Sequence, residues 1–151
     1  MLFSVTLLLG LAVCDAKVEP VSASTVTIVY PASGSLNELL AAKEVRRYVY
    51  LRSGQLLDVK PVASLPASGD LIVVAANGNT LLESLRDPIA YEPREGETLL
   101  KSVAEDGRNI LVVSGADAEA TLMAAYRSGT RIGVGFDLAG DAIPAARVEL
   151  F

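Results

Sequence analysis

Residues 109–144, NILVVSGADAEATLMAAYRSGTRIGVGFDLAGDAIP, decide the fold class of this chain. Residues 110–113 form an uninterrupted apolar run, which is typical of a strand buried on both faces. Gly115 makes a tight turn, Asp117 can cap a helix, and that helix should end near Gly133. A glycine-rich loop closes the stretch. The pattern therefore predicts a strand, a turn, a helix and an exit loop.

The helix that follows Asp117 has a small residue in its expected inner stripe. Gly129 lies at the centre of that stripe, where glycine costs about 1 kcal/mol of helix propensity relative to alanine. We therefore expect the backbone of a strand or helix to pack closely against it. At 100° per residue the inner stripe is predicted to contain Ala118, Leu122, Ala125, Tyr126, Gly129 and Ile132.

A second long helix is predicted over residues 36–53. Ser35 and Glu38 have the spacing of a capping box, and Gly54 marks the end of the helix. Before it, residues 25–30 alternate as in a half-buried strand until PASG interrupts them. One broad helical face is predicted to contain Leu40, Ala41, Ala42, Val45, Tyr48, Val49 and Leu51.

Charged residues of this helix divide into two groups. Lys43, Arg46 and Arg47 project to the opposite face and are expected to meet solvent. Glu44 and Arg52 project within or beside the apolar stripe, where an unpaired charge is costly, so both should have partners. We interpret them as a structural pair or as rim positions. Contact with a neighbouring domain is the alternative.

Shorter elements complete an α+β pattern in which two long helices cover one side of a sheet. Residues 57–62 are predicted to form a strand that Pro61 restricts to an edge or an end. Residues 71–75 read as a central strand and residues 80–86 as a short helix. Residues 97–104 and 109–114 are predicted to form a hairpin around the Asp-Gly pair at 106–107.

The N-terminal residues 1–16 are typical of a secretory signal peptide. Their uncharged apolar core, residues 2–14, is too short to cross a bilayer, and the small residues Cys14 and Ala16 suit a cleavage site. Lys17 would then begin the mature chain. A bacterial lipoprotein signal at Cys14 is the less favoured alternative. The predicted location is extracellular or periplasmic.

Composition narrows the classes of partner and of fold. Cleavage after Ala16 would remove Cys14, the single cysteine, so no disulfide framework is expected. Losing Asp15 with the signal would change the net charge from −5 to −4. This acidic balance argues against nucleic acid or an anionic membrane as a partner, and no membrane partner is expected after signal cleavage. The length suits one domain and is too short to add a catalytic barrel of about 250 residues.

Few residues of this chain suit catalysis. The absence of histidine excludes a histidine general base, a Ser-His-Asp triad and an HExxH zinc site. Glycosidic chemistry needs only two carboxylates, so an enzyme that uses carboxylates alone stays an alternative. We interpret the candidates as solvated loop charges. They are Glu92, Glu95 and Glu97 in one loop, and Asp137 and Asp141 in another.

Two possible binding features lie on the second long helix. The strand that runs through Gly115 into the helix is not favoured as a dinucleotide site, because Asp117 would repel a phosphate. Arg127 and Arg131, four residues apart on the outer face, can bind a carboxylate such as an acidic sugar. We interpret them as a solvated face. With no tryptophan and scattered tyrosines, a sugar-stacking lectin is not favoured.

Two segments carry a resemblance to a known family. Residues 41–54, AAKEVRRYVYLRSG, resemble the first helix of the N-terminal domain of α-glucuronidases and β-N-acetylhexosaminidases. Residues 110–144, ending in GDAIP, resemble its last strand, helix and exit loop. The resemblance implies a zincin-like mixed sheet with two helices on one face and without the zinc. It implies no cofactor, metal ligand or catalytic residue in this chain.

We therefore expect a non-catalytic accessory domain of a secreted glycoside hydrolase, which would support a catalytic barrel outside this chain. A stand-alone secreted module that binds carbohydrate or another protein is the alternative. The predicted organisation is a signal peptide at 1–16, a linker at 17–24, the domain at 25–144 and the start of a connection at 145–151. The chain alone is not expected to be an enzyme.

Overall fold

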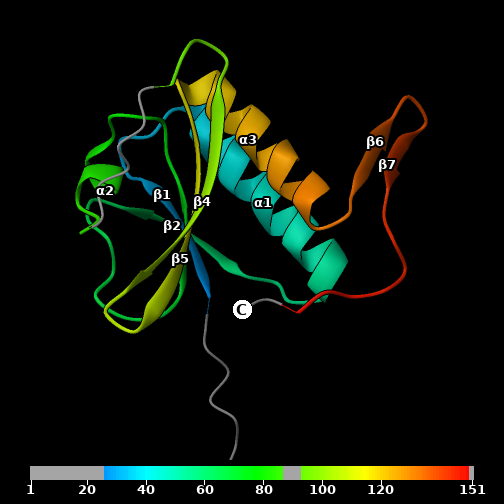
Figure 1. The fold of residues 1–151 in the computed structure, drawn as a ribbon, viewed down its shortest axis with the longest axis horizontal. Helices are drawn as coiled ribbons and strands as arrows, with labels where there is room; N and C mark the ends of the chain where they lie inside the picture. The colour runs from blue at the N-terminus through cyan, green and yellow to red at the C-terminus, as the bar shows by residue number, and fades with distance from the viewer. Residues whose placement is uncertain (1–25, 87–92, 150–151) are drawn as a thin grey trace, which may run out of the picture.

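The computed structural model describes residues 26–86 and 93–149 as an α+β fold with a mixed sheet and three helices (Figure 1). The predicted signal peptide, the linker and Glu92 lie outside these residues. The elements, in chain order, are β1 (Thr27–Pro31), α1 (Leu36–Ser53), β2 (Asp58–Val62), β3 (Leu71–Val74), α2 (Thr80–Glu83), β4 (Thr98–Glu105), β5 (Arg108–Gly115), α3 (Ala118–Arg131), β6 (Gly135–Asp137) and β7 (Gly140–Ala142).

The main sheet has five strands in the order β2-β1-β3-β5-β4. Its first four strands are parallel, and β4 runs antiparallel to β5. Every residue of β3 is buried, as the predicted central strand requires. Strand β2 lies at an edge, where Pro61 costs no bond on the outer side. The Asp106-Gly107 turn joins β4 to β5 with positive φ at both residues, 52° and 74°, as a type I′ hairpin needs.

Helices α1 and α3 lie side by side on one face of the sheet, and the short helix α2 lies on the other (Figure 1). One apolar cluster fills the space under the two long helices and includes Ile28, Val45 and Val113. A second cluster, which includes Val73, Leu81 and Ile110, fills the opposite side. The prediction that two long helices cover one side of the sheet is confirmed.

Helix α1 has the predicted bounds and the predicted caps. The Ser35 hydroxyl accepts from the Glu38 amide, the Glu38 carboxylate accepts from the Ser35 amide, and Gly54 takes a φ of 79°. Ala41, Ala42, Val45, Tyr48 and Val49 are buried as expected. The prediction is wrong for Leu40 and Leu51, which are 42% and 39% exposed because the buried stripe is narrower than the predicted face.

The buried stripe of α3 also differs from its prediction. Ala125 and Gly129 are buried as predicted, whereas Ala118, Leu122, Tyr126 and Ile132 are only half-buried. The residues that replace them inside are Ala120, Thr121 and Ala124. The helix is rotated so that its smallest side chains face the sheet, because the sheet comes close to its first turn.

Gly115 shows how close that approach is. A Cβ atom built on Gly115 would lie 2.2 Å from the carbonyl carbon of Ala120 and 2.4 Å from the amide nitrogen of Thr121. The first turn of α3 therefore packs directly on the end of β5. Close packing at Gly129 is also observed, but its neighbours are the rings of Tyr48 and Phe136 rather than a backbone, which corrects the prediction.

The segment predicted as a glycine-rich exit loop is a small hairpin, β6-β7, which corrects that prediction. Its Phe136 ring contacts the rings of Tyr48 and Tyr126, with centroids 5.4 and 5.8 Å apart. Helix α2 is also shorter than predicted. It ends at Glu83 because Ser84 caps it, with the Ser84 hydroxyl donating to the carbonyl of Leu81 over 2.8 Å.

Candidate functional site

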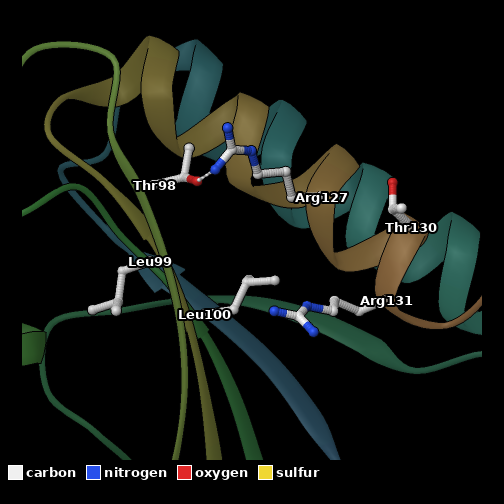
Figure 2. A pocket seen from close by; sticks show the side chains of 6 residues that line it. All are labelled: Thr98, Leu99, Leu100, Arg127, Thr130 and Arg131. Carbon is white, nitrogen blue, oxygen red and sulfur yellow. Dashed lines mark hydrogen bonds between the residues drawn. The ribbon is translucent and has the colours of Figure 1, made fainter.

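A surface cavity of about 380 Å³ lies between β4 and the last two turns of α3 (Figure 2). The described residues that line it include two guanidinium groups and no carboxylate. Leu100 adds apolar surface and two threonines add hydroxyl groups, whereas the Leu99 side chain points to the other side of β4 (Figure 2). The lining is Thr98, Leu99, Leu100, Arg127, Thr130 and Arg131.

Helix α3 and the β4-β5 hairpin bring the two arginines to this cavity. Arg127 and Arg131 are exposed, as predicted for the outer face of the helix. The Arg127 Nη1 atom donates to the Thr98 hydroxyl over 2.8 Å, which holds the guanidinium over the start of β4. Arg131 points along the same cavity toward Leu100 (Figure 2). The arrangement can attract an anionic group, because arginine pairs well with carboxylates.

Arg127 and Arg131 are therefore the sequence-predicted residues that the fold brings together. Thr98, the partner of Arg127, is not predicted, since nothing in its local sequence distinguishes it from other strand threonines. It reaches Arg127 only because β4 is the last strand of the sheet and α3 covers its near end.

The candidate carboxylates do not gather in this cavity. The Glu97 side chain accepts from the Arg94 amide over 2.8 Å, within its own turn. Glu95 lines a smaller cavity of about 240 Å³ that Asp117 and Glu119 also line. Asp117 is occupied there as the cap of α3, since its Oδ1 accepts from the Ala120 amide over 2.8 Å.

Asp137 and Asp141 are bonded to different partners. Asp137 Oδ1 accepts from the Ala139 amide over 2.7 Å, inside the β6-β7 turn. Asp141 Oδ2 accepts from Arg47 Nη2 over 2.8 Å and from the Tyr48 hydroxyl over 3.1 Å. This pair therefore serves the hairpin and its attachment to α1 instead of facing a common reacting atom.

The turn at Gly115 is used for packing. The buried Thr121 hydroxyl accepts from the Gly115 amide over 3.1 Å and donates to the Asp117 carbonyl over 2.7 Å. A phosphate bound at this helix N-terminus would need free backbone amides. It would also have to approach the helix where no acidic residue caps it. In this turn the Gly115 amide is bonded to Thr121 and the Ala120 amide to Asp117. The sequence pattern does not identify Thr121, because a polar residue outside the predicted inner stripe is expected to face solvent, whereas Thr121 is buried.

Glu44 and Arg52 both have partners, as expected, but they do not pair with each other. Glu44 Oε2 accepts from Arg47 Nη1 over 3.2 Å. Arg52, which is 5% exposed, donates through Nε to the carbonyl of Ile132 over 2.5 Å. Its Nη1 donates to the carbonyls of Pro144 and Ala146 over 2.7 and 2.5 Å. Arg52 therefore joins the end of α1, the end of α3 and the segment after β7.

Lys43 and Arg47 are exposed as predicted, whereas Arg46 is half-buried. Beside Arg47, the Tyr48 ring is 1% exposed, and its hydroxyl bonds to both Arg47 and Asp141. Burial, reinforced by the hydrogen bond to Asp141, raises the pKa of Tyr48 from 10.0 to about 12. Tyr48 thus stays protonated and donates to Asp141 at neutral pH.

Comparison with family models and with curated proteins found no match to this chain. Among residues 26–86 and 93–149, no group of three or more acidic or cysteine side chains is placed to hold a metal ion. Within the same ranges, no helix is long and apolar enough to span a membrane.

Proposed function

We propose that this chain is a non-catalytic accessory domain of a secreted glycoside hydrolase of the α-glucuronidase or β-N-acetylhexosaminidase type. It would have the zincin-like arrangement that the resemblance implies, and it would support a catalytic barrel encoded outside these residues. Two long helices on one face of a mixed sheet agree with that arrangement.

The observation that carries the proposal is the route of the chain after α3. The β6-β7 hairpin returns to α1 through Asp141, and the next residues cross the end of α1 under Arg52. The Val148 amide then donates to the carbonyl of Arg52 over 2.9 Å. A connection held at so many points would fix the orientation of a following domain, which is what a supporting domain requires.

Exposed apolar side chains favour the same role. Leu138 at the hairpin tip is fully exposed, Leu36 at the start of α1 is 84% exposed, and Leu56 just beyond α1 is 71% exposed. Phe136 is 42% exposed while its ring packs on Tyr48 and Tyr126. Such side chains are common at contacts between domains, where they are covered by a partner.

The deciding experiment is to read the coding sequence downstream of Phe151 and to express the encoded product with and without this domain. We expect an encoded barrel whose hydrolysis of aryl glucuronides or aryl N-acetylhexosaminides, or whose thermal stability, falls when residues 25–144 are deleted. Hydrolysis of either substrate by this chain alone would contradict the proposal, as would a downstream sequence that encodes no barrel.

A second candidate function is a stand-alone secreted binding module, and the cavity with Arg127 and Arg131 favours it. Its test is a titration of the purified protein with an acidic polysaccharide. Saturable binding that Arg127→Ala or Arg131→Ala weakens would support this role. Equal binding by both variants and the unaltered protein would remove it.

A further inference from the structure

The two edges of the main sheet are built differently. Strand β2 has five residues, contains Pro61, and carries the exposed ion pair of Lys60 with Asp58, 3.3 Å apart. Proline and surface charge are the usual means of preventing further strand pairing. Strand β4 has eight residues, no proline and an unbroken register of eight pairs with β5, and its charged residues, Lys101 and Glu105, are at odd-numbered positions. Among residues 26–86 and 93–149, no strand pairs with the side of β4 that faces away from β5.

The alternation of the antiparallel ladder identifies the backbone groups at that free edge. The Ala116 amide donates to the Glu97 carbonyl over 3.0 Å, and a two-residue turn joins Glu105 to Arg108. Both features place the odd-numbered residues of β4 in the hydrogen-bonded pairs with β5. The even-numbered residues therefore direct their N–H and C=O groups outward. They are Thr98, Leu100, Ser102 and Ala104.

Arg127 and Arg131 lie beside the first half of this edge, next to Thr98 and Leu100 (Figure 2). Four residues of an α-helix rise about 6 Å. Two residues of a strand span about 6.7 Å, so side chains at alternate positions of an added strand have nearly the same spacing as the two arginines. The cavity thus combines the outward main-chain groups of Thr98 and Leu100, which pair with no other strand among residues 26–86 and 93–149, with positive charges at strand spacing.

We propose that the outer edge of β4 binds an extended acidic peptide as an added strand. Its main chain pairs with the even-numbered residues of β4, and carboxylates at two alternate positions pair with Arg127 and Arg131. Main-chain bonds supply the affinity and the two arginines select the sequence, as in other cases of strand addition. This binding goes beyond the proposed accessory role and does not depend on it.

The charges favour an acidic peptide over a second copy of this chain. Residues 98–104, TLLKSVA, contain no carboxylate, so a second β4 strand would bring none to Arg127 or Arg131. The next residue, Glu105, already accepts from the Arg86 amide over 2.9 Å and lies 3.7 Å from Arg108. A partner of different sequence must therefore supply the negative groups.

The test uses a fluorescent peptide of alternating valine and glutamate and measures its anisotropy with the purified protein. Two control peptides separate the two parts of the recognition. Glutamine in place of glutamate removes the charge, and N-methylation of alternate amides removes strand pairing while keeping the charge. We expect saturable binding of the first peptide only, weakened by added salt.

Variants of the protein provide the matched comparison. Ser102→Pro removes an outward N–H without removing a bond to β5, so it should keep the fold and reduce affinity at least about tenfold. Arg127→Gln and Arg131→Gln should each weaken binding roughly twofold to fivefold, as expected for exposed ion pairs. Lys43→Gln, an exposed charge on α1, should leave binding unchanged.

Hydrogen exchange locates the contact independently of affinity. Peptide binding should slow exchange at the amides of Leu100, Ser102 and Ala104, while circular dichroism confirms that each variant is folded. Equal binding of the N-methylated peptide, or unchanged affinity in Ser102→Pro, would overturn the proposal. Self-association that Ser102→Pro abolishes would assign the edge to a second copy and would overturn it too.

Discussion

At the scale of the residue, Tyr48 links the stability of this protein to pH. It lies at the contact of α1 with the β6-β7 hairpin, where its ring is buried and its hydroxyl bonds to Arg47 and Asp141. Burial and the bond to Asp141 raise its pKa in the folded protein to about 12, against 10.0 when it is free. Folding therefore favours the protonated form of Tyr48.

The expected result is a loss of stability at alkaline pH. Because the pKa is raised on folding, the contribution of Tyr48 is complete below about pH 10 and is lost as the pH rises through about 12. The shift corresponds to at most about 3 kcal/mol. Because pH 11 lies midway between the two pKa values, urea unfolding at pH 8 and pH 11 should show about half of this loss, a fall of about 1.4 kcal/mol in the free energy of unfolding.

The comparison with Tyr48→Phe isolates this residue from the other effects of alkaline pH on the protein. The variant should lose about 1 kcal/mol at pH 8, because its hydrogen bonds are absent. Its free energy of unfolding should then fall less than that of the unaltered protein between pH 8 and pH 11. The same slope in both proteins would show that another group causes the alkaline loss.

At the scale of the element, the contact between β5 and α3 depends on Gly115. A methyl group there would meet the backbone of Ala120 and Thr121 at 2.2 and 2.4 Å, and neither atom belongs to a flexible side chain. Gly115→Ala should therefore force α3 away from the sheet and cost about 3 kcal/mol of the free energy of unfolding. Chemical denaturation measures the loss.

Gly129→Ala is the matched comparison. Its new methyl would meet the rings of Tyr48 and Phe136 at 3.2 and 3.3 Å, which a small shift of the rings relieves. The gain in helix propensity of about 1 kcal/mol offsets part of the remaining cost. A larger loss in Gly129→Ala than in Gly115→Ala would show that the aromatic contact, not the strand contact, limits the position of α3.

The elements that sequence predicts well are those whose signals are local. The bounds of α1 follow from Ser35, Glu38 and Gly54, and the β4-β5 hairpin follows from Asp106-Gly107. The β6-β7 hairpin was not predicted, because its strands have three residues each and its stability comes from distant contacts. Asp141, for example, bonds to Arg47, which lies 94 residues earlier in the chain.

The candidate site also has features that local sequence predicts and features that depend on distant contacts. Helical periodicity predicts that Arg127 and Arg131 are exposed and close together. Their position beside the outer edge of β4 could not be predicted, because it depends on the order of strands in the sheet and on the rotation of α3. That rotation buries Ala120, Thr121 and Ala124. These side chains are buried because β5 approaches α3 closely at Gly115, and not because they are the most hydrophobic residues of the helix.

At the scale of the whole molecule, Arg52 connects parts of the chain that are distant in sequence. Its guanidinium donates to carbonyls of Ile132, Pro144 and Ala146, and its own carbonyl accepts from the Val148 amide. The positive charge also lies in the last turn of α1, where the helix dipole stabilises a cation. One side chain thus fixes both the end of α3 and the segment after β7.

Arg52→Met tests whether this one side chain fixes the path of the chain after β7. Methionine keeps an apolar stem but removes every donor, leaving three carbonyls without the bonds that Arg52 supplied. We expect the variant to lose about 1.5–3 kcal/mol of the free energy of unfolding, the usual contribution of hydrogen bonds to a charged group. Amide exchange at Val148 should accelerate by more than exchange in β3, because the segment after β7 would detach before the sheet opens. Arg46→Met, a half-buried arginine on the same helix, is the control and should leave the exchange of Val148 unchanged. If Val148 instead exchanged at the same rate in Arg52→Met as in the unaltered protein, the contacts of Asp141 with Arg47 and Tyr48 would be enough to hold the segment. Arg52 would then serve only to bond the carbonyl at the end of α3.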